Sequence, residues 1–135
     1  MIIGIGSDLV DIRRIDKLSA RFPDKFRQRI LNDSEQQLME QHKTHPNYRL
    51  AKYFAAKEAA WKALGEPRSH GIGWHDFEIG YAASGKPELI LKDKALLVLK
   101  SKISKGMEAA IHLSLSDEYP YAQAFVVIEA NRLII

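Results

Sequence analysis

Two charged residues, Glu58 and Lys62, lie four positions apart in a stretch made mostly of alanine and aromatic residues, AKYFAAKEAAWKALG at 51–65. This spacing places both side chains on one face of a helix. The simplest interpretation is a surface ion pair, which stabilises a helix by only about 0.2–0.5 kcal/mol. The small alanines leave room for a ligand, however, and a carboxylate beside an ammonium group suits a magnesium–phosphate group. The pattern therefore also predicts a phosphate site.

A second carboxylate would strengthen the magnesium hypothesis, because Mg²⁺ usually takes one or two carboxylates and completes its shell with water and phosphate oxygens. Asp8, at the expected end of the first strand, is the candidate. The sequence contains no cysteine, which excludes thiolate catalysis and cysteine-bound zinc or iron–sulfur sites. Any metal must therefore be bound through oxygen or imidazole ligands.

The elements that must position these residues follow an α+β order along the chain. The opening run IIGIGSDLV alternates and is rich in β-branched residues, which predicts a strand that ends near Asp8. Asp33 and Gln36 have the spacing of a capping box and predict a helix start. Apolar residues at helical spacing predict three short helices, over 11–21, 24–31 and 33–42.

The stretch that carries Glu58 and Lys62 is expected to form a helix of about four turns over 51–64. A loop at 43–47 is predicted before it. Gly65 occupies the usual position just after a helix, and Pro67 follows it. The limits of the central helix are thus well marked in the sequence.

The second half of the chain predicts strands and one further helix. The expected elements are a hairpin of 74–81 and 87–91 around the turn AASGK, an amphipathic helix over 92–104, and paired strands 109–116 and 121–129 around the turn DEYP. In the strand 109–116, His112 and Ser114 alternate with apolar residues and predict a polar row on the sheet. Together the elements predict a single α+β domain with an antiparallel sheet packed against helices.

Composition limits the class of protein. A chain of 135 residues with 46% hydrophobic and 27% charged residues is typical of one globular domain. No apolar run reaches the roughly 20 residues of a membrane span, and the first charges follow the N-terminal apolar segment, the reverse of a signal peptide. We therefore expect a cytoplasmic protein that does not bind membranes.

The charge of the chain is unevenly distributed. Residues 11–29 contain seven basic and three acidic residues, a net charge of +4, whereas the whole chain carries +3. Such a helix face often serves only for solvation. A non-catalytic nucleic-acid-binding module that uses 13–29 is a second possibility, but it has no use for Asp8 and Glu58, which would repel a phosphate backbone. We expect no nucleic-acid partner.

Four segments carry a resemblance to a known family. GIGSDLVDIRRI, KYFAAKEAAWKALG, SGKPEL and HLSLSDE, in this order, resemble holo-acyl carrier protein synthases over essentially the whole chain. The resemblance implies a single 4'-phosphopantetheinyl transferase domain over 1–135 that serves fatty acid biosynthesis. Such an enzyme moves the phosphopantetheine arm of coenzyme A onto a serine of apo-acyl carrier protein and releases adenosine 3',5'-bisphosphate. It also implies a Mg²⁺ requirement and a homotrimer with sites between subunits.

The resemblance assigns roles to the charged residues discussed above. Asp8 and Glu58 are similar to the two carboxylates that hold Mg²⁺ against the coenzyme A pyrophosphate, and Lys62 to the phosphate-binding lysine. All three are therefore predicted to be catalytic. The acceptor serine must lose a proton, and either Glu58 or a metal-bound water could take it.

Further residues are predicted by resemblance to contact coenzyme A. Gly85 alone would be read as part of a hairpin turn, and His112 alone as a structural or exposed histidine. Asp117 receives no role. The residues expected to bind coenzyme A are Lys62, Gly65, Gly85, Lys86, Pro87, His112 and Ser114.

The basic segment resembles the carrier-docking helix of the family. Acyl carrier proteins are strongly acidic, so basic residues would steer the encounter and a few apolar residues would hold it. The predicted docking residues are Arg14, Arg21, Phe22, Lys25 and Phe26. A non-catalytic carrier-binding protein of the same fold is the remaining alternative.

Overall fold

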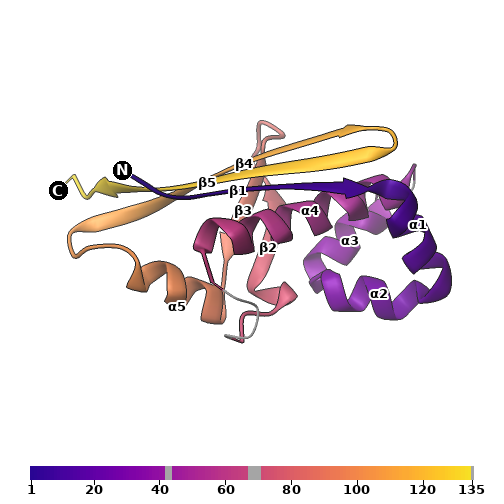
Figure 1. Cartoon of the computed structure of the whole chain (residues 1–135), viewed down its shortest axis with the longest axis horizontal. Helices are drawn as coiled ribbons and strands as arrows, with labels where there is room; N and C mark the ends of the chain where they lie inside the picture. Colours follow the sequence, from indigo (N-terminus) through magenta and orange to yellow (C-terminus); the bar gives the residue numbers. More distant parts are fainter. Residues whose placement is uncertain (42–43, 67–70, 135) are drawn as a thin grey trace.

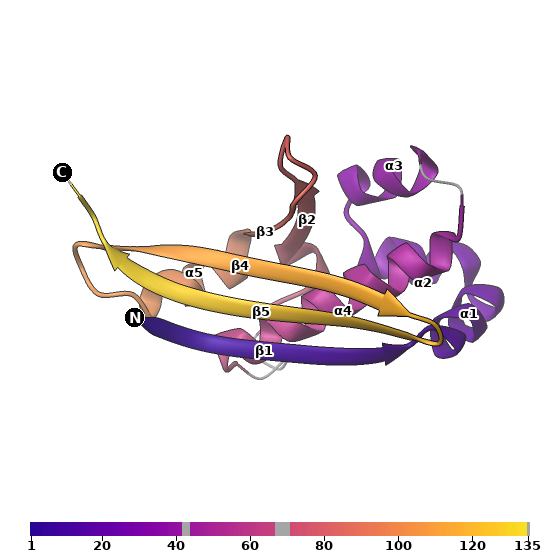
Figure 2. The same ribbon diagram turned by 90° about the horizontal axis from the view of Figure 1, so that it is seen from above.

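A long helix, α4 (Pro46–Leu64), lies along one face of a three-stranded antiparallel sheet (Figures 1 and 2). The computed structural model describes residues 1–41, 44–66 and 71–134. The sheet has the order β1-β5-β4, with β5 in the centre. Its strands are β1 (Ile2–Asp11), β4 (Met107–Glu118) and β5 (Tyr121–Arg132). The predicted α+β fold with an antiparallel sheet packed against helices is confirmed.

The smaller elements gather at the two ends of α4. Three short helices follow β1 at one end and α5 lies at the other, while the hairpin of β2 and β3 projects past the β4 edge of the sheet (Figure 2). These elements are α1 (Ile12–Arg21), α2 (Pro23–Ile30), α3 (Asp33–Gln41), the 3-10 turn η2 (Trp74–Asp76), β2 (Phe77–Tyr81), β3 (Pro87–Leu91) and α5 (Asp93–Ser101). Within the described part of the chain, no helix is long and apolar enough to cross a membrane.

Two glycines allow α4 and β1 to approach closely. A Cβ atom at Gly4 would lie 1.8 Å from the carbonyl oxygen of Ala63, and one at Gly6 would lie 1.8 Å from that of Ala59. No side chain fits in such a space, so these positions require glycine and the facing helix positions are alanine. The close approach places the charged turn of α4 directly beside the strand that carries Asp8.

The alternation of β1 gives the sheet two different faces. The face of Gly4, Gly6 and Val10 is covered by α4. The apolar side chains Ile5 and Leu9 point the other way and are 57% and 62% exposed. Phe125 of β5 pairs with Ser7 and therefore lies on the same outer face. It is 43% exposed. The sheet therefore presents an apolar surface that residues 1–41, 44–66 and 71–134 leave exposed.

The strands of the sheet are longer than predicted: β4 runs over 107–118 and not 109–116, and β5 continues to Arg132 and does not end at 129. We expected β1 to end near Asp8, but it continues to Asp11, because pairing with β5 runs on to Tyr121. Asp8 is therefore inside the strand, opposite Ala124, and faces the helix. The expected turn 117–120 is shorter than predicted, since 117–118 still belong to β4. Backbone pairing with β5, from a distant segment for β1 and from the next strand for β4, extends the strands beyond their apolar patterns.

The start of α4 was also predicted wrongly. Pro46 and Asn47 belong to the helix and not to a loop, since Pro46 occupies its first turn, where a missing N–H is tolerated. Gly65 ends the helix in the left-handed conformation, as expected. The hairpin strand begins at Phe77, because 74–76 form a 3-10 turn. The expectations for His42, Lys43 and Pro67 fall outside the described residues.

The start of α3 has one of the two hydrogen bonds of a capping box, shifted by one residue from the prediction, and Asn32 Oδ1 is buried with no partner among the described residues. Asn32 is the residue before the helix, and its backbone N–H donates to Glu35 Oε1 at 2.7 Å. The pair Asp33 and Gln36 has the right spacing but not this role. Glu35 was overlooked because it is fully buried, which is unusual for a carboxylate.

Candidate active site

Asp8 and Lys62 meet where β1 passes α4. The Nζ atom of Lys62 donates to the carbonyl oxygen of Ser7 at 2.8 Å and to Asp8 Oδ1 at 3.1 Å. The Asp8 side chain is only 16% exposed, whereas that of Lys62 is 54% exposed. The ammonium group of Lys62 is therefore hydrogen-bonded to β1, and its side chain remains accessible to a ligand from solvent.

Glu58 precedes Lys62 by about one turn of α4 and so projects from the same side of the helix. Gly6 of β1 contacts Ala59 of α4, and Asp8 lies two residues further on the same face of the strand. The carboxylate of Asp8 therefore faces the helix near the turn that contains Glu58. The structure thus brings the three predicted catalytic residues to one junction between two elements.

The donor set at this junction fits Mg²⁺. Among residues 1–41, 44–66 and 71–134, no group of three or more His, Asp or Glu side chains is arranged to hold a metal ion. A dedicated protein cage is not what Mg²⁺ needs, because it binds through one or two carboxylates and takes its other ligands from water and phosphate. Asp8 and Glu58 are the residues that would hold it.

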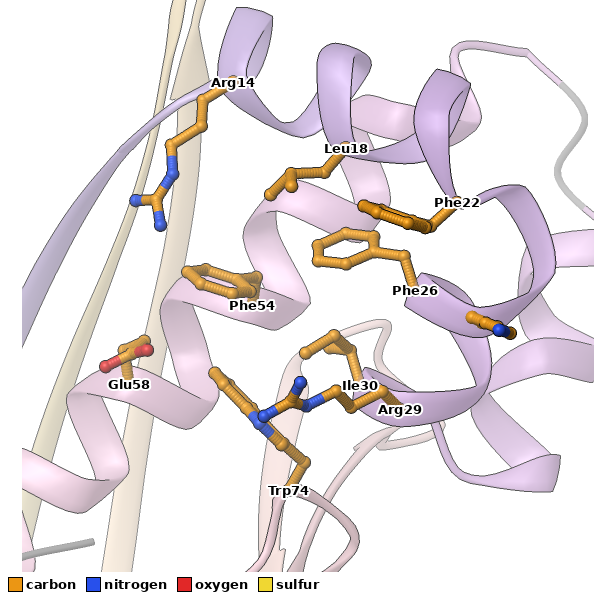
Figure 3. A pocket seen from close by; sticks show the side chains of 10 residues that line it. Arg14, Leu18, Phe22, Phe26, Arg29, Ile30, Phe54, Glu58 and Trp74 are labelled. Atoms are coloured by element: carbon orange, nitrogen blue, oxygen red, sulfur yellow. The ribbon is translucent and has the colours of Figure 1, made fainter.

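A groove of about 430 Å³ opens beside Glu58, between α1, α2, α4 and η2 (Figure 3). Apolar and aromatic side chains form its floor, and the exposed cations Arg14, Lys25 and Arg29 surround it. Arg14 points into the groove from α1, with its guanidinium carbon 5.9 Å from the centre of the Phe54 ring. The full lining is Arg14, Leu18, Phe22, Lys25, Phe26, Arg29, Ile30, Phe54, Glu58 and Trp74.

Four of the five predicted docking residues line this groove, and Arg21 does not. The Arg21 guanidinium lies over the ring of Phe22, 5.0 Å from its centre. Sequence reasoning missed the apolar floor, to which Leu18 and Ile30 contribute. Their spacing of four from Phe22 and Phe26 was a usable signal, whereas nothing in the sequence indicated Trp74.

The residues expected to bind coenzyme A lie in separate places. Gly85 and Lys86 are exposed in the turn between β2 and β3, followed by Pro87, the first residue of β3. Gly85 has a φ of 88°, which that turn requires. Gly65 lies at the end of α4, beyond Lys62.

His112 and Ser114 lie on the outer face of the sheet. Ser114 pairs with Phe125 of the outer face. Asp8 lies on the opposite face, in line across the sheet with Ala124 of β5 and Leu115 of β4. His112 Nε2–H donates to Glu129 Oε1 at 2.8 Å, and this hydrogen bond lowers the pKa of the Glu129 carboxyl. Within one chain, the sheet therefore separates His112 and Ser114 from the three predicted catalytic residues.

Asp117, which received no role, pairs with a lysine of the central helix. Its Oδ1 lies 3.1 Å from Lys52 Nζ. Lys52 lies on α4 and Asp117 on β4, so this contact fastens the helix to the edge strand on the side away from β1. Asp117 therefore has a structural partner in this fold.

A family model described as the 4'-phosphopantetheinyl transferase superfamily matches residues 4–124. The chain belongs to this superfamily. It is 46% identical over 130 residues to a holo-[acyl-carrier-protein] synthase of Rhizobium leguminosarum bv. trifolii, with 96% of each chain covered. The resemblance expected from the four sequence segments is confirmed.

Solved structures agree with this assignment. A holo-[acyl-carrier-protein] synthase from Neisseria meningitidis has a TM-score of 0.80 at 39% identity, covering 96% of this chain and 99% of that one. Another, from Bacillus anthracis and in complex with CoA (3',5'-ADP), has a TM-score of 0.75 at 33% identity, covering 95% and 96%. The chain is thus a phosphopantetheinyl transferase whose fold matches such enzymes over nearly its full length.

Proposed function

We propose that this transferase moves the 4'-phosphopantetheine group of coenzyme A to a serine of apo-acyl carrier protein and releases adenosine 3',5'-bisphosphate. The observation that carries the proposal is the junction of α4 and β1. There Lys62 Nζ lies 3.1 Å from Asp8 Oδ1, and Glu58 stands one helical turn away on the wall of the groove. A coenzyme A pyrophosphate at the junction and a carrier in the groove would meet beside Glu58.

Phosphoryl transfer at such a site depends on positioning and electrostatics and needs no covalent intermediate. Bound Mg²⁺, held by Asp8 and Glu58, would neutralise charge on the pyrophosphate. Lys62 would stabilise the negative charge that develops on the leaving bisphosphate. The proton of the acceptor serine would pass to Glu58, the carboxylate on the groove wall, or to a metal-bound water.

The groove suits an acidic carrier protein. Its rim carries Arg14, Lys25 and Arg29, and its floor offers aromatic rings to apolar side chains of the partner. Charge complementarity speeds encounter and fixes orientation, whereas buried apolar anchors supply most of the affinity. We assign carrier docking to the groove residues Arg14, Phe22, Lys25 and Phe26.

Mass spectrometry of an apo-carrier incubated with the protein, coenzyme A and Mg²⁺ tests the reaction directly. Phosphopantetheine transfer adds about 340 Da to the carrier, and the gain should be lost when a chelator removes Mg²⁺. A carrier that binds but gains no mass would support the non-catalytic alternative instead.

We further propose a homotrimer with sites shared between subunits. Ile5, Leu9 and Phe125 leave an apolar outer face that a second copy would cover, as large exposed apolar patches commonly mark interfaces. Such packing would bring His112 and Ser114 of one copy toward the junction on another, together with Gly85, Lys86 and Pro87 of the hairpin. It would also explain why one chain holds these residues apart.

A mixture of two impaired variants tests whether the site is shared between subunits. Lys62→Ala and His112→Ala should each lower transfer at least about tenfold, or about 1.4 kcal/mol in barrier. Co-expressed, they should regain part of the activity, because some mixed trimers contain a site with both residues intact. Sedimentation should show three copies per particle. A monomeric particle, or a mixture no more active than its parts, would contradict the shared site.

We also propose that the reaction takes place in the cytoplasm, the compartment expected from the sequence.

A further inference from the structure

One wall of the groove is supplied by a helix with little stability of its own. α2 has eight residues, of which only Ile30 is buried, and no side chain caps its N-terminus. Yet it carries Phe26, Arg29 and Ile30 of the groove (Figure 3), and also Lys25. An isolated helix of this length is unstable in water, so its position depends on contacts with the rest of the fold.

A buried lysine of α4 holds the C-terminal end of α2. Lys57 Nζ donates to the carbonyl oxygen of Ile30 at 2.6 Å and to Glu35 Oε1 at 2.7 Å. The last carbonyls of a helix have no partner within it, and a cation there also complements the helix dipole. Lys57 thus binds, from α4, the carbonyl of the last residue of α2.

Glu35 fixes this lysine in place. Its Oε1 also accepts the backbone N–H of Asn32 at 2.7 Å, and its Oε2 accepts that of Ile79 at 2.8 Å. The side chains of Lys57 and Glu35 are fully buried. Burial lowers the pKa of Lys57, and the facing Glu35 carboxylate opposes this shift. The pair joins the end of α2, the start of α3 and β2 to the central helix.

A second link holds the same end of α2 from outside. His75 of η2 donates from Nε2–H to the carbonyl oxygen of Gln28 at 2.7 Å. Two carbonyls in the last turn of α2 are therefore bound by side chains from other elements. Both links act on the groove wall and neither residue lines the groove.

We propose that Lys57, together with Glu35 and His75, positions α2 across from α4 and so sets the width of the carrier groove. Lys57 and Glu58 are consecutive residues of α4, so the helix that presents Glu58 to the groove also anchors the opposite wall. A buried ion pair often stabilises a fold no better than apolar residues of the same size. Its value here is the fixed geometry of the wall. The inference rests on the carrier docking proposed above.

The main test is the double variant Lys57→Met/Glu35→Gln, which removes both charges and leaves neither one unpaired. We expect the carrier KM to rise about tenfold, with the coenzyme A KM within about twofold of the original value and kcat at saturating carrier within about threefold. Backbone amides of 23–31 should exchange hydrogen faster, while those of α4 keep their protection. A purely structural role would instead lower kcat with the folded fraction and leave both KM values unchanged.

Matched variants make the test specific. Lys52→Met also replaces a lysine of α4 by methionine, but Lys52 pairs with Asp117 of β4 and does not contact α2 through that pair. This variant should leave the carrier KM unchanged. His75→Ala, at the surface, should raise the carrier KM about threefold, and His75→Gln should restore it, because glutamine can still donate to the carbonyl of Gln28. If the double variant does not fold, the comparison of His75→Ala with His75→Gln still tests the positioning role.

The inference is overturned if His75→Ala and a folded double variant both keep the original carrier KM. If Arg14→Glu still raises the carrier KM in the same assay, carrier docking stands and only the positioning role fails. If Arg14→Glu also has no effect, the docking proposal itself is wrong and the positioning role falls with it.

Discussion

Replacing Glu58 with glutamine should lower kcat/KM for transfer by more than about a thousandfold, or about 4 kcal/mol in barrier, without unfolding the protein. The substitution keeps size and hydrogen-bonding capacity but removes the charge that would hold Mg²⁺ and accept the serine proton. Asp8→Asn should behave similarly, and it also removes the charge that pairs with Lys62 at 3.1 Å. Transfer to apo-carrier measured at saturating Mg²⁺ gives the result.

Glu78→Gln is the matched control. Glu78 Oε1 accepts a hydrogen bond from Ser34 Oγ at 2.6 Å and lies 3.0 Å from Lys92 Nζ, outside the groove, so loss of its charge should change transfer less than about threefold. Circular dichroism should show the same fold for all three variants. Transfer by Glu58→Gln within about tenfold of the original rate, only about 1.4 kcal/mol, would show that Glu58 is not a metal ligand or base.

Arg14→Glu should raise the carrier KM by about ten- to a hundredfold and leave the coenzyme A KM nearly unchanged. Arg14 points into the groove, and reversal of its charge converts an attraction for an acidic carrier into a repulsion of about 1–3 kcal/mol. Steady-state kinetics with each substrate varied in turn separates the two KM values.

Arg13→Glu is the control, because it makes the same reversal of charge at the neighbouring position. Arg13 pairs with Asp11 at 2.7 Å and does not line the groove, so it should change the carrier KM less than about threefold. The carrier KM of the original protein should rise with salt, because exposed charges are screened beyond about 8 Å at physiological ionic strength, and Arg14→Glu should show a flatter response. Equal effects of the two reversals would indicate general charge attraction and contradict docking in the groove.

The sequence alone determined the local features and the family. The period of the central helix, its glycine stop and the spacing of Glu58 and Lys62 follow from short-range rules, and so does the strand that carries Asp8. Four segments in a fixed order were enough to indicate the transferase family. The local features are predictable because each depends on residues close together in the chain, and the family because each of its four segments is itself a short local motif.

The tertiary structure decided which faces meet. Alternation in β1 shows two faces but not which one a helix covers, and the answer came from the close contact of Gly6 with Ala59, residues 53 positions apart in sequence. The placement of His112 across the sheet from Asp8 likewise depends on strand register. Nothing in the local sequence separates Lys57 from the exposed charges of α4, because its burial depends on Glu35 from another element. Contacts of this kind join residues far apart in the chain, so no local pattern records them.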